Sequence, residues 1–276
     1  MQLNREQNGM PLHDKIAIIT GSTEGIGNRI AAHLASLGSH VVITSRNRET
    51  AEKAARELAS CGGSVTCQCF ELQNQQSGKA LIENVIAEHG RLDILINSAI
   101  SRPTPLSSAL VQNFDYDQLQ LYITSNITHV LALTLRAYPY LKKTKGSVLN
   151  IGSTIINRHI LGTLLYSVAK GAMAQMTKAL AAEWAPDRIR VNQINPGFVL
   201  TDSFQKLIPQ DHFHEVTDLY RRHHPLGKVG DPRNIGVLAG HMLSDELSWM
   251  TGSIVDIDGG YSVKGIPNPL NSIFGK

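Results

Sequence analysis

The feature that most constrains the fold of this chain is an apolar run that leads directly into a glycine-rich turn. Residues 15–20 read KIAIIT, which is typical of a strand buried on both faces. Gly21, Gly25 and Gly27 follow at once, and apolar residues then recur at helical spacing over residues 26–37. A strand, a glycine turn and a helix in this order predict the first unit of a parallel α/β sheet.

The same alternation continues along the chain. Further strands are expected at 40–44, 65–70, 92–97, 147–151, 189–194 and 253–257, and further helices at about 49–60, 75–89, 116–141, 166–184 and 232–243. Strands separated by single helices imply right-handed crossovers. We therefore predict an α/β fold with one Rossmann-like, doubly wound parallel sheet of about seven strands flanked by helices.

The glycine turn is the first candidate ligand site. Residues without a Cβ let backbone N–H groups approach a pyrophosphate at the positive end of a helix. The spacing over residues 21–27 is GxxxGxG, in place of the usual dinucleotide fingerprint GxGxxG. Taken alone, the three glycines are equally well explained as an ordinary tight turn.

The end of the second strand indicates which dinucleotide would fit. In this fold an acid at that position accepts hydrogen bonds from the adenosine ribose. Here Ser45, Arg46 and Asn47 follow the strand instead, and Arg48 suits a solvated helix start. A hydroxyl followed by a guanidinium suits a ribose 2′-phosphate, so we predict NADP(H), with Arg46 as its main cationic contact.

Three later positions extend this candidate site. Glu71 follows the third strand, where it could meet the adenine amino group or be an ordinary surface acid. Residues 97–100 (NSAI) end the fourth strand, at the switch point where ligands lodge in doubly wound sheets. Asn126 lies inside a long predicted helix, where asparagine competes for backbone bonds, so it is either functional or a satisfied buried amide.

A catalytic pair is predicted in the helix that follows the fifth strand. Tyr166 and Lys170 are four residues apart, so both side chains lie on one helix face. A nearby ammonium favours the phenolate of a tyrosine, whose ordinary pKa is about 10. Ser153 stands at the end of the fifth strand. Taken alone, the tyrosine and lysine are better explained as an ordinary pair on an amphipathic helix.

Composition excludes several classes of function. A net charge of +3 and the lack of a basic tract argue against nucleic-acid binding, and no apolar run is long enough to cross a membrane. We expect a cytoplasmic protein. Cys61, Cys67 and Cys69 are interpreted as small buried apolar residues, so no metal site and no disulfide framework is predicted.

Taken together, these motifs resemble the short-chain dehydrogenase/reductase family. TGSTEGIG at 20–27, NSAI at 97–100, Ser153, YSVAK at 166–170 and Pro196-Gly197 correspond to its TGxxxGxG, NNAG, serine, YxxxK and PG motifs. The resemblance covers about residues 14–262, which we predict to be one dinucleotide-binding catalytic domain. Residues 1–13 and 263–276 are expected to be tails.

The resemblance implies a catalytic tetrad of Asn126, Ser153, Tyr166 and Lys170. Tyr166 would exchange a proton with the carbonyl or alcohol oxygen, and Ser153 would polarise that oxygen. Lys170 would hold the nicotinamide ribose and lower the tyrosine pKa, while Asn126 and a water would relay protons. The full set of expected cofactor contacts is Gly21, Ser22, Thr23, Gly25, Ile26, Gly27, Ser45, Arg46, Asn47, Glu71, Leu72, Asn97, Ala99, Ile100, Tyr166, Lys170, Pro196, Gly197, Val199 and Thr201.

The chain departs from the family pattern at three positions. Ser98 and Ile100 replace an Asn and the Gly of NNAG, and Glu71 replaces the more usual Asp. The end of the second strand, Thr44 to Arg46, looks like the peroxisomal NADPH-dependent carbonyl reductases. We therefore predict an NADPH-dependent reductase of hydrophobic carbonyls. The alternatives are a 3-oxoacyl carrier-protein reductase and a dinucleotide-binding regulator without chemistry, and relatives commonly form tetramers or dimers.

Residues 201–230 lack a strand pattern and are predicted to form a helical lid over the substrate. Its apolar residues recur at helical spacing, which favours a hydrophobic substrate; they are Phe204, Leu207, Ile208, Phe213, Val216 and Leu219. Its basic residues are His212, His214, Arg221, Arg222, His223 and His224. We interpret them as a solvated helix face. Contact with a phosphopantetheine or carrier protein stays open, and a metal site is disfavoured.

Overall fold

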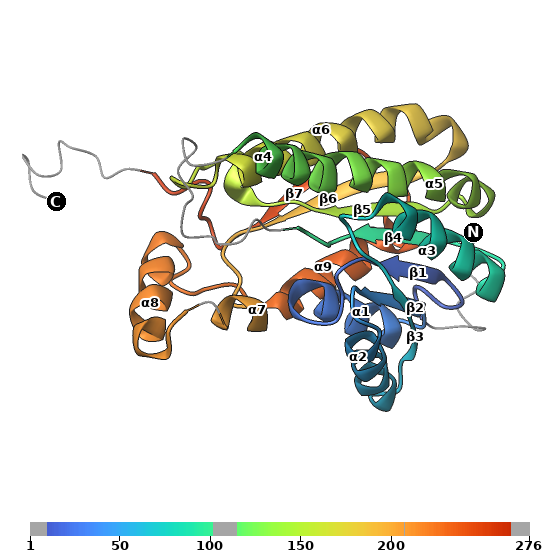
Figure 1. The fold of residues 1–276 in the computed structure, drawn as a ribbon, viewed down its shortest axis with the longest axis horizontal. Helices are drawn as coiled ribbons and strands as arrows, with labels where there is room; N and C mark the ends of the chain where they lie inside the picture. The colour runs from blue at the N-terminus through green and yellow to red at the C-terminus, as the bar shows by residue number, and fades with distance from the viewer. Residues whose placement is uncertain (1–9, 102–114, 207, 266–276) are drawn as a thin grey trace, which may run out of the picture.

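The centre of the molecule is a seven-stranded parallel sheet with the strand order β3-β2-β1-β4-β5-β6-β7 (Figure 1). The computed structural model describes residues 10–101, 115–206 and 208–265. The strands are β1 (Ile16–Ile19), β2 (His40–Ser45), β3 (Ser64–Cys69), β4 (Ile94–Asn97), β5 (Ser147–Ile151), β6 (Arg190–Pro196) and β7 (Ile254–Ile257). The predicted α/β fold class is confirmed.

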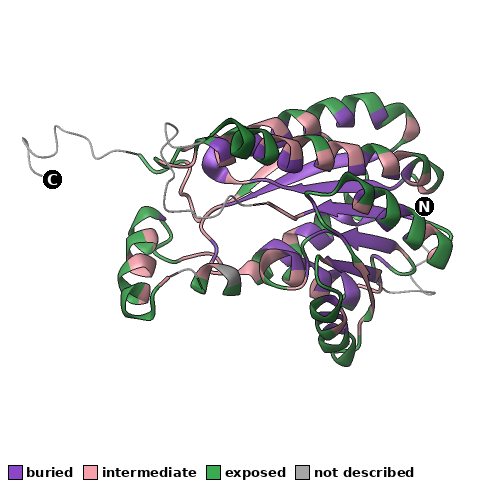
Figure 2. Cartoon of the chain, in the orientation of Figure 1, coloured by how far each residue is buried: buried purple, intermediate pink, exposed green. Residues whose placement is uncertain are grey.

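Helices cover both faces of the sheet. They are α1 (Gly25–Ser36), α2 (Arg48–Ser60), α3 (Gln75–His89), α4 (Tyr116–Ile123), α5 (His129–Thr144), α6 (Leu164–Trp184), α7 (Asp202–Gln205), α8 (Phe213–His223) and α9 (Pro232–Leu243). One core packs α1, α2 and α9 against one face, and a second packs α3, α5 and α6 against the other. The central strands are buried on both sides, as continuous apolar runs require (Figure 2).

The order of the strands reverses between β1 and β4. Ile19 pairs with Ile43 of β2 on one side and with Ile96 of β4 on the other. All strands are parallel, so their carboxyl ends meet along one edge of the sheet. The glycine turn, residues 97–100 and Ser153 all follow strands that end at this edge. The fold thus brings these distant motifs together at the switch point.

Helices α1 and α9 pack unusually closely. A Cβ on Gly236 would lie 2.7 Å from the carbonyl oxygen of Arg29, and one on Gly240 would lie 2.8 Å from side-chain atoms of His33 and Leu37. The two glycines therefore allow α9 to lie directly against the helix that follows the glycine turn.

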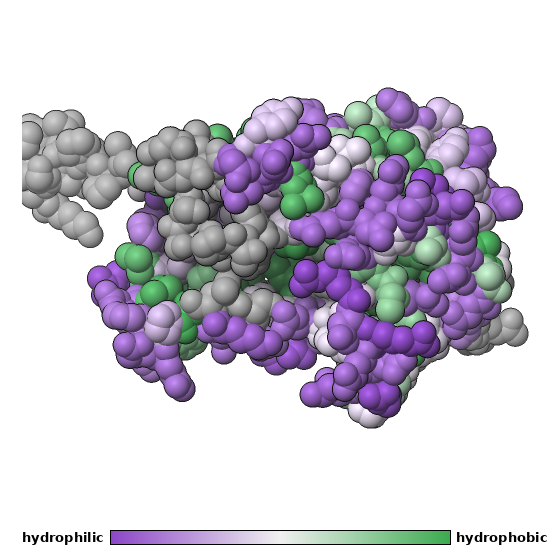
Figure 3. Space-filling model, in the orientation of Figure 1, coloured by the Kyte–Doolittle hydropathy of each residue, from purple (hydrophilic) through white to green (hydrophobic). Residues whose placement is uncertain are grey.

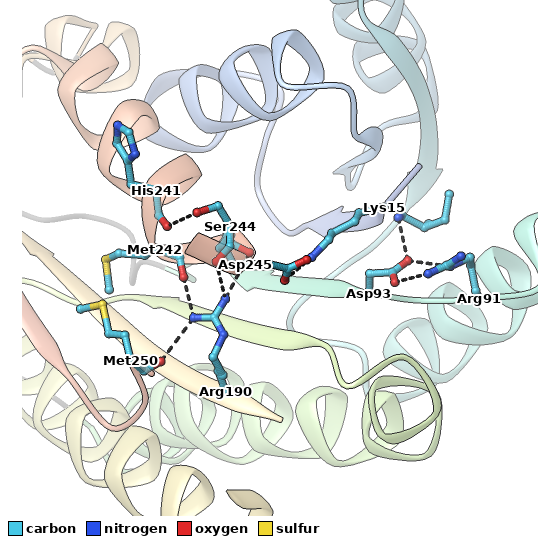
Figure 4. A network of polar contacts seen from close by, with 11 residues as sticks. Lys15, Arg91, Asp93, Arg190, His241, Met242, Ser244, Asp245 and Met250 are labelled. Carbon is cyan, nitrogen blue, oxygen red and sulfur yellow. Dashed lines mark hydrogen bonds and ion pairs between the residues drawn. The ribbon is translucent and has the colours of Figure 1, made fainter. Parts of the chain in front are cut away.

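A polar network lies at the edge of the sheet where the strands begin, opposite the glycine turn (Figure 4). The buried guanidinium of Arg190 donates hydrogen bonds to the carbonyl oxygens of Met242, Leu243, Ser244 and Met250. It therefore caps the C-terminal end of α9, where carbonyls lack helical partners. Burial lowers the pKa of Arg190 from its ordinary value.

The interpretation of the cysteines as buried residues is wrong. Cys61 and Cys69 are exposed and Cys67 is half-buried, all as free thiols. Cys67 and Cys69 lie on β3, an edge strand with no neighbouring strand on its outer side among the described residues, and Cys61 stands at the exposed end of α2. Within the described residues, no group of three His, Cys, Asp or Glu side chains is arranged to hold a metal ion.

The predicted tails fall only partly within the described residues. Residues 1–9 and 266–276 lie outside them. Leu12 is fully buried and its N–H donates to the carbonyl of Leu37, so the end of the first predicted tail packs on α1. Among the described helices, none is both long and apolar enough to cross a membrane.

Candidate active site

A cavity of about 880 Å³ lies at the carboxyl ends of the strands. Its walls include most residues of the predicted cofactor and catalytic sets, namely Gly21, Thr23, Gly25, Ile26, Gly27, Ser45, Arg46, Glu71, Leu72, Ala99, Ile100, Ser153, Tyr166, Lys170, Pro196, Gly197, Val199 and Thr201. Four predicted residues do not line it: Ser22, Asn47, Asn97 and Asn126.

The glycine turn is shaped by positions where a side chain would not fit. Gly21 has a φ of +64°, and a Cβ there would lie 2.8 Å from the Cα of Ala99. A Cβ on Gly27 would lie 2.5 Å from the carbonyl oxygen of Gly21. The buried hydroxyl of Ser22 accepts from the N–H of Thr44 at 2.9 Å, which fixes the turn to β2. Ser22 therefore fixes the glycine turn to β2 and does not line the cavity.

Of the residues predicted at the end of β2 to contact a 2′-phosphate, some line the cavity and one does not. Ser45 and Arg46 line the cavity. Asn47 instead caps α2, because its side-chain oxygen accepts from the N–H of Thr50 at 2.9 Å. Arg48 pairs with Glu52 on the surface of α2, as expected for a helix start. The geometry leaves Arg46 as the guanidinium at this end of the cavity.

The end of β4 is held by buried hydrogen bonds. The hydroxyl of Thr20 accepts from the N–H groups of Ser98 and Ala99, each at 3.0 Å. The side chain of Asn97 is buried beneath the cavity and donates to Asn150 and Thr134. The side chain of Ile100 lies in the cavity wall, where the family pattern has glycine.

Ser153, Tyr166 and Lys170 converge on the cavity from two elements. Ser153 follows β5, and its hydroxyl oxygen accepts from the N–H of Ile155 at 3.2 Å. Lys170 is buried, and its Nζ donates to the carbonyl of Ile151 at 2.6 Å. The same Nζ lies 5.7 Å from the centre of the Tyr166 ring. The ammonium is therefore close enough to act electrostatically on the phenol.

Asn126 lies in a break of the predicted long helix. Residues 124–128 form a π-helical segment between α4 and α5, and such segments are frequent at functional sites. The buried side chain of Asn126 donates to the carbonyls of Ser101 and Tyr122 and accepts from the N–H of Ser101 at 2.9 Å. The side chain is thus fully satisfied, and it joins the helix to the segment after β4.

Four aromatic side chains form the far wall of the cavity, and the sequence interpretation named only one of them, Phe204, as part of the lid. Phe198 and Tyr220 stack at 3.6 Å between ring centres, and Phe204 meets Phe198 edge-on at 4.7 Å. Tyr261 lies under the guanidinium of Arg158 at 4.7 Å. All four aromatic rings belong to cavity-lining residues. Phe198 follows the Pro-Gly motif directly, which is the signal that could have revealed it.

The lid is helical as predicted, with α7 and α8 projecting from the sheet (Figure 1). Figure 3 shows hydrophobic surface on this side of the molecule, beside hydrophilic side chains. Phe204, Ile208, Phe213 and Val216 are half-buried, whereas Leu219 is 56% exposed. Leu207 lies outside the described residues. Burial raises the pKa of Tyr220, so its phenol stays neutral.

The interpretation of the basic lid residues as a solvated face is wrong for His224. This ring is buried, its Nδ1 lies 2.6 Å from the carbonyl oxygen of Tyr220, and its Nε2 accepts from the N–H of Phe198. It therefore ties α8 to the segment after β6. The other basic residues are exposed: His212, His214, Arg221, Arg222 and His223.

Comparison with known proteins places this site in a family. A family model described as enoyl-(acyl carrier protein) reductase matches residues 21–262. The chain belongs to the short-chain dehydrogenase/reductase family. The match extends from the glycine turn past Tyr261, so it includes the whole of the cavity wall.

Individual short-chain dehydrogenase/reductases match over almost their whole length. A tropinone reductase homolog of Arabidopsis thaliana is 32% identical, over 90% of this chain and 89% of that protein. The 3-oxoacyl-[acyl-carrier-protein] reductase of Thermotoga maritima is 30% identical, over 91% of this chain and 99% of that protein. A short-chain dehydrogenase/reductase structure from Serratia marcescens superposes with a TM-score of 0.82 at 26% identity, covering 91% and 99% of the two chains.

Family membership makes the chain an oxidoreductase of carbonyl or alcohol substrates that uses a nicotinamide dinucleotide. The relatives differ in the substrates in their names, although they are about equally similar to this chain. The identity of the substrate therefore has to be argued from the cavity itself.

Proposed function

We propose that this short-chain dehydrogenase/reductase is an NADPH-dependent reductase of hydrophobic ketones or aldehydes. The observation that carries the proposal is the shared cavity. It joins Arg46 and the glycine turn to Ser153, Tyr166 and Lys170, and it ends at the aromatic wall of Phe198, Phe204 and Tyr220. A cavity with an apolar wall and few polar groups favours an apolar substrate with one reacting oxygen.

The residues present fit a dinucleotide. The glycine turn leaves no room for side chains where Gly21 approaches Ala99, so backbone groups face the place of the pyrophosphate. Arg46 and Ser45 would hold the 2′-phosphate, and Glu71 would meet the adenine. Pro196, Gly197, Val199 and Thr201 would grip the carboxamide end. When bound, NADPH supplies the hydride.

Each catalytic side chain has a role that its contacts allow. The hydroxyl of Ser153 accepts one hydrogen bond from the backbone, so its proton can be donated to a carbonyl oxygen. Tyr166 donates the proton that completes the alcohol. Lys170, buried beside the phenol, favours its ionised form and would hold the nicotinamide ribose. Asn126 would contribute to the proton path through the π-helical segment.

Homo-oligomerisation through the long helices and a cytoplasmic location complete the proposal. Both follow from family resemblance and composition, as does the assignment of residues 14–262 to one catalytic domain. Size-exclusion chromatography with light scattering would test the expectation of a tetramer or dimer.

A 3-oxoacyl carrier-protein reductase is the second candidate. The similarity to the Thermotoga maritima enzyme favours it, as do the exposed guanidinium groups of Arg221 and Arg222 on the lid helix α8. Acyl-carrier substrates bring phosphate groups that such arginines attract.

A substrate panel tests both candidates and the regulator alternative. It should contain a reactive diketone, aryl and alkyl ketones, and a 3-oxoacyl thioester, each with NADPH and with NADH. We expect NADPH oxidation that is fastest with the apolar carbonyls. Preference for the thioester would favour the second candidate. Cofactor binding without turnover of any substrate would favour a regulator.

A further inference from the structure

The backbone that carries Ser153 is held by polar side chains that lie outside the cavity. The N–H of Ser153 donates to Oδ1 of Asn195 at 3.1 Å. Nδ2 of Asn195 donates to Oδ1 of Asp256 at 2.9 Å. The other carboxylate oxygen of Asp256 accepts from Nδ2 of Asn157 at 2.7 Å. The carboxylate of Asp256 on β7 thus holds residues 152–157, here called the serine turn, through Asn195 and through Asn157.

The amide of Asn195 has only one workable orientation. Its Oδ1 also accepts from Nε2 of Gln193 at 2.7 Å, and Oε1 of Gln193 accepts in turn from the hydroxyl of Thr177 at 3.1 Å. Rotating the amide of Asn195 would place an NH₂ group against two donors. Asn195 and Gln193 are both fully buried, so no water replaces the lost bonds.

The serine turn is also pressed onto these two side chains. A Cβ on Gly152 would lie 2.1 Å from Oδ1 of Asn195 and 2.3 Å from Nε2 of Gln193. The backbone before Ser153 therefore rests directly on the amides. A change in the position of Asn195 would move the turn.

We infer that Asn195 and Asp256 are positioning residues for the carbonyl reduction proposed above, on which this inference rests. They do not line the cavity, and they act by fixing the backbone of Ser153. The hydroxyl of Ser153 must meet the carbonyl oxygen at hydrogen-bond distance. A displacement of about 1 Å can cost about 100-fold in rate. Cofactor contacts at the glycine turn are remote from this network and stay unchanged.

The pairing of an amide with a carboxylate allows an exchange test. Asn195→Asp places two carboxylates against each other. Asp256→Asn leaves only one oxygen for two amide donors and for the hydroxyl of Ser262, which also donates to this carboxylate. The double variant reverses the pair. The carboxylate introduced at position 195 still accepts from Ser153 and Gln193, while the amide introduced at position 256 donates to that carboxylate and accepts from Asn157. Every hydrogen bond of the network is then restored.

We expect each single variant to lose about 10-fold or more in kcat for a reactive diketone such as 2,3-hexanedione, with a smaller change in the KM for NADPH, because the glycine turn and Arg46 are left in place. The double variant should return to within about threefold of the wild-type kcat, because its pairing is complete. Wild-type kcat in both single variants would overturn the inference, and so would a double variant as slow as the singles.

Hydrogen exchange of the Ser153 amide provides a measurement that does not need turnover. Exchange should be faster in both single variants and return to the wild-type rate in the double variant. Asn192→Ala is the matched control, because Asn192 lies on the same strand and bonds to Met250 and Ser253, away from the serine turn. It should lower Tm without changing kcat or the exchange of Ser153.

These measurements test the proposed carbonyl reduction and the positioning of Ser153 separately. A wild type that reduces none of the panel carbonyls would overturn the proposed function, while the exchange data would still decide whether the network positions Ser153. Unchanged amide exchange in Asn195→Asp and Asp256→Asn would overturn the network, whatever the activity.

Discussion

The phenol of Tyr166 depends on its neighbours for any chemistry at neutral pH. An ordinary tyrosine has a pKa of about 10, so a charge is needed nearby to make proton exchange efficient. In the proposed mechanism Lys170 would supply that charge from a buried position, where the attraction is less screened than at the surface. The carbonyl of Ile151, which accepts from the ammonium, keeps the lysine directed toward the cavity.

Tyr166→Phe should therefore remove turnover and keep cofactor binding. We expect kcat to fall by a factor of about 10² to 10⁴, which is the usual contribution of a positioned general acid. The dissociation constant for NADPH, measured by its fluorescence, should change little. A Tyr166→Phe enzyme that turns over at nearly the wild-type rate would contradict the proposed mechanism.

Ser45 and Arg46 should set the choice of cofactor. The pair offers a hydroxyl and a permanent cation, and no acid stands where a ribose 2′-hydroxyl would be bound. Ser45→Asp combined with Arg46→Ile should reverse the preference from NADPH to NADH, because it adds repulsion as well as removing attraction. The ratio of kcat/KM for the two cofactors measures this. Equal use of both cofactors by the wild type would show that this strand end has been misinterpreted.

At residue level the sequence motifs predicted the cavity wall but not what lies behind it. Gly21, Ser153, Tyr166 and Lys170 line the cavity, and they could be named because each motif has fixed spacing. The contacts of Asn195 could not be predicted, because one of them is to a carboxylate far along the chain. The burial of His224 was also missed, since one of its partners, the N–H of Phe198, lies before the lid.

The elements themselves could be predicted well, because hydrophobic periodicity is a local property. Helices α3 and α9 and strand β5 begin and end where the sequence pattern predicts. The π-helical segment at 124–128 could not be foreseen, because hydrophobic periodicity carries no information on the long-range bonds that Asn126 makes to Ser101. The exposure of Cys69 was missed because a local pattern does not reveal that β3 is an edge strand.

The lid gives a prediction that separates the two candidate substrates. Arg221 is exposed and already pairs with Asp218 at 3.1 Å, and Arg222 is exposed beside it. Arg221→Glu with Arg222→Glu should therefore change the KM for a neutral aromatic or alkyl ketone little. Steady-state kinetics at two salt concentrations measure this. A large, salt-dependent rise in KM confined to acyl-CoA or acyl-carrier substrates would favour the 3-oxoacyl reductase instead.

At the scale of the whole molecule, two half-buried histidines make stability depend on pH. Burial, together with the neighbouring His241 and His89, lowers the pKa of His33 and His40 from 6.5. The unfolded chain therefore binds more protons than the folded chain as the pH falls below 6.5. These histidines thus stabilise the fold at neutral pH, and that contribution is lost on acidification.

The test compares urea unfolding of the wild type with that of a His33→Gln and His40→Gln double variant at about pH 7 and pH 5. We expect the variant to lose less of its unfolding free energy between the two values. Carboxylates remote from the two histidines titrate alike in both proteins, so the difference reports on the histidines together with Glu88, which acts on His40. Equal losses in the two proteins would contradict the assignment.

The close packing of α9 on α1 has a consequence for how the protein is made. A ribosome releases α1 and the glycine turn long before Gly236 and Gly240, which lie against α1. Until α9 is made, the helix behind the turn therefore lacks its cover. We expect nascent chains to need protection by chaperones during this interval, and to acquire affinity for the dinucleotide only after α9 has been synthesised.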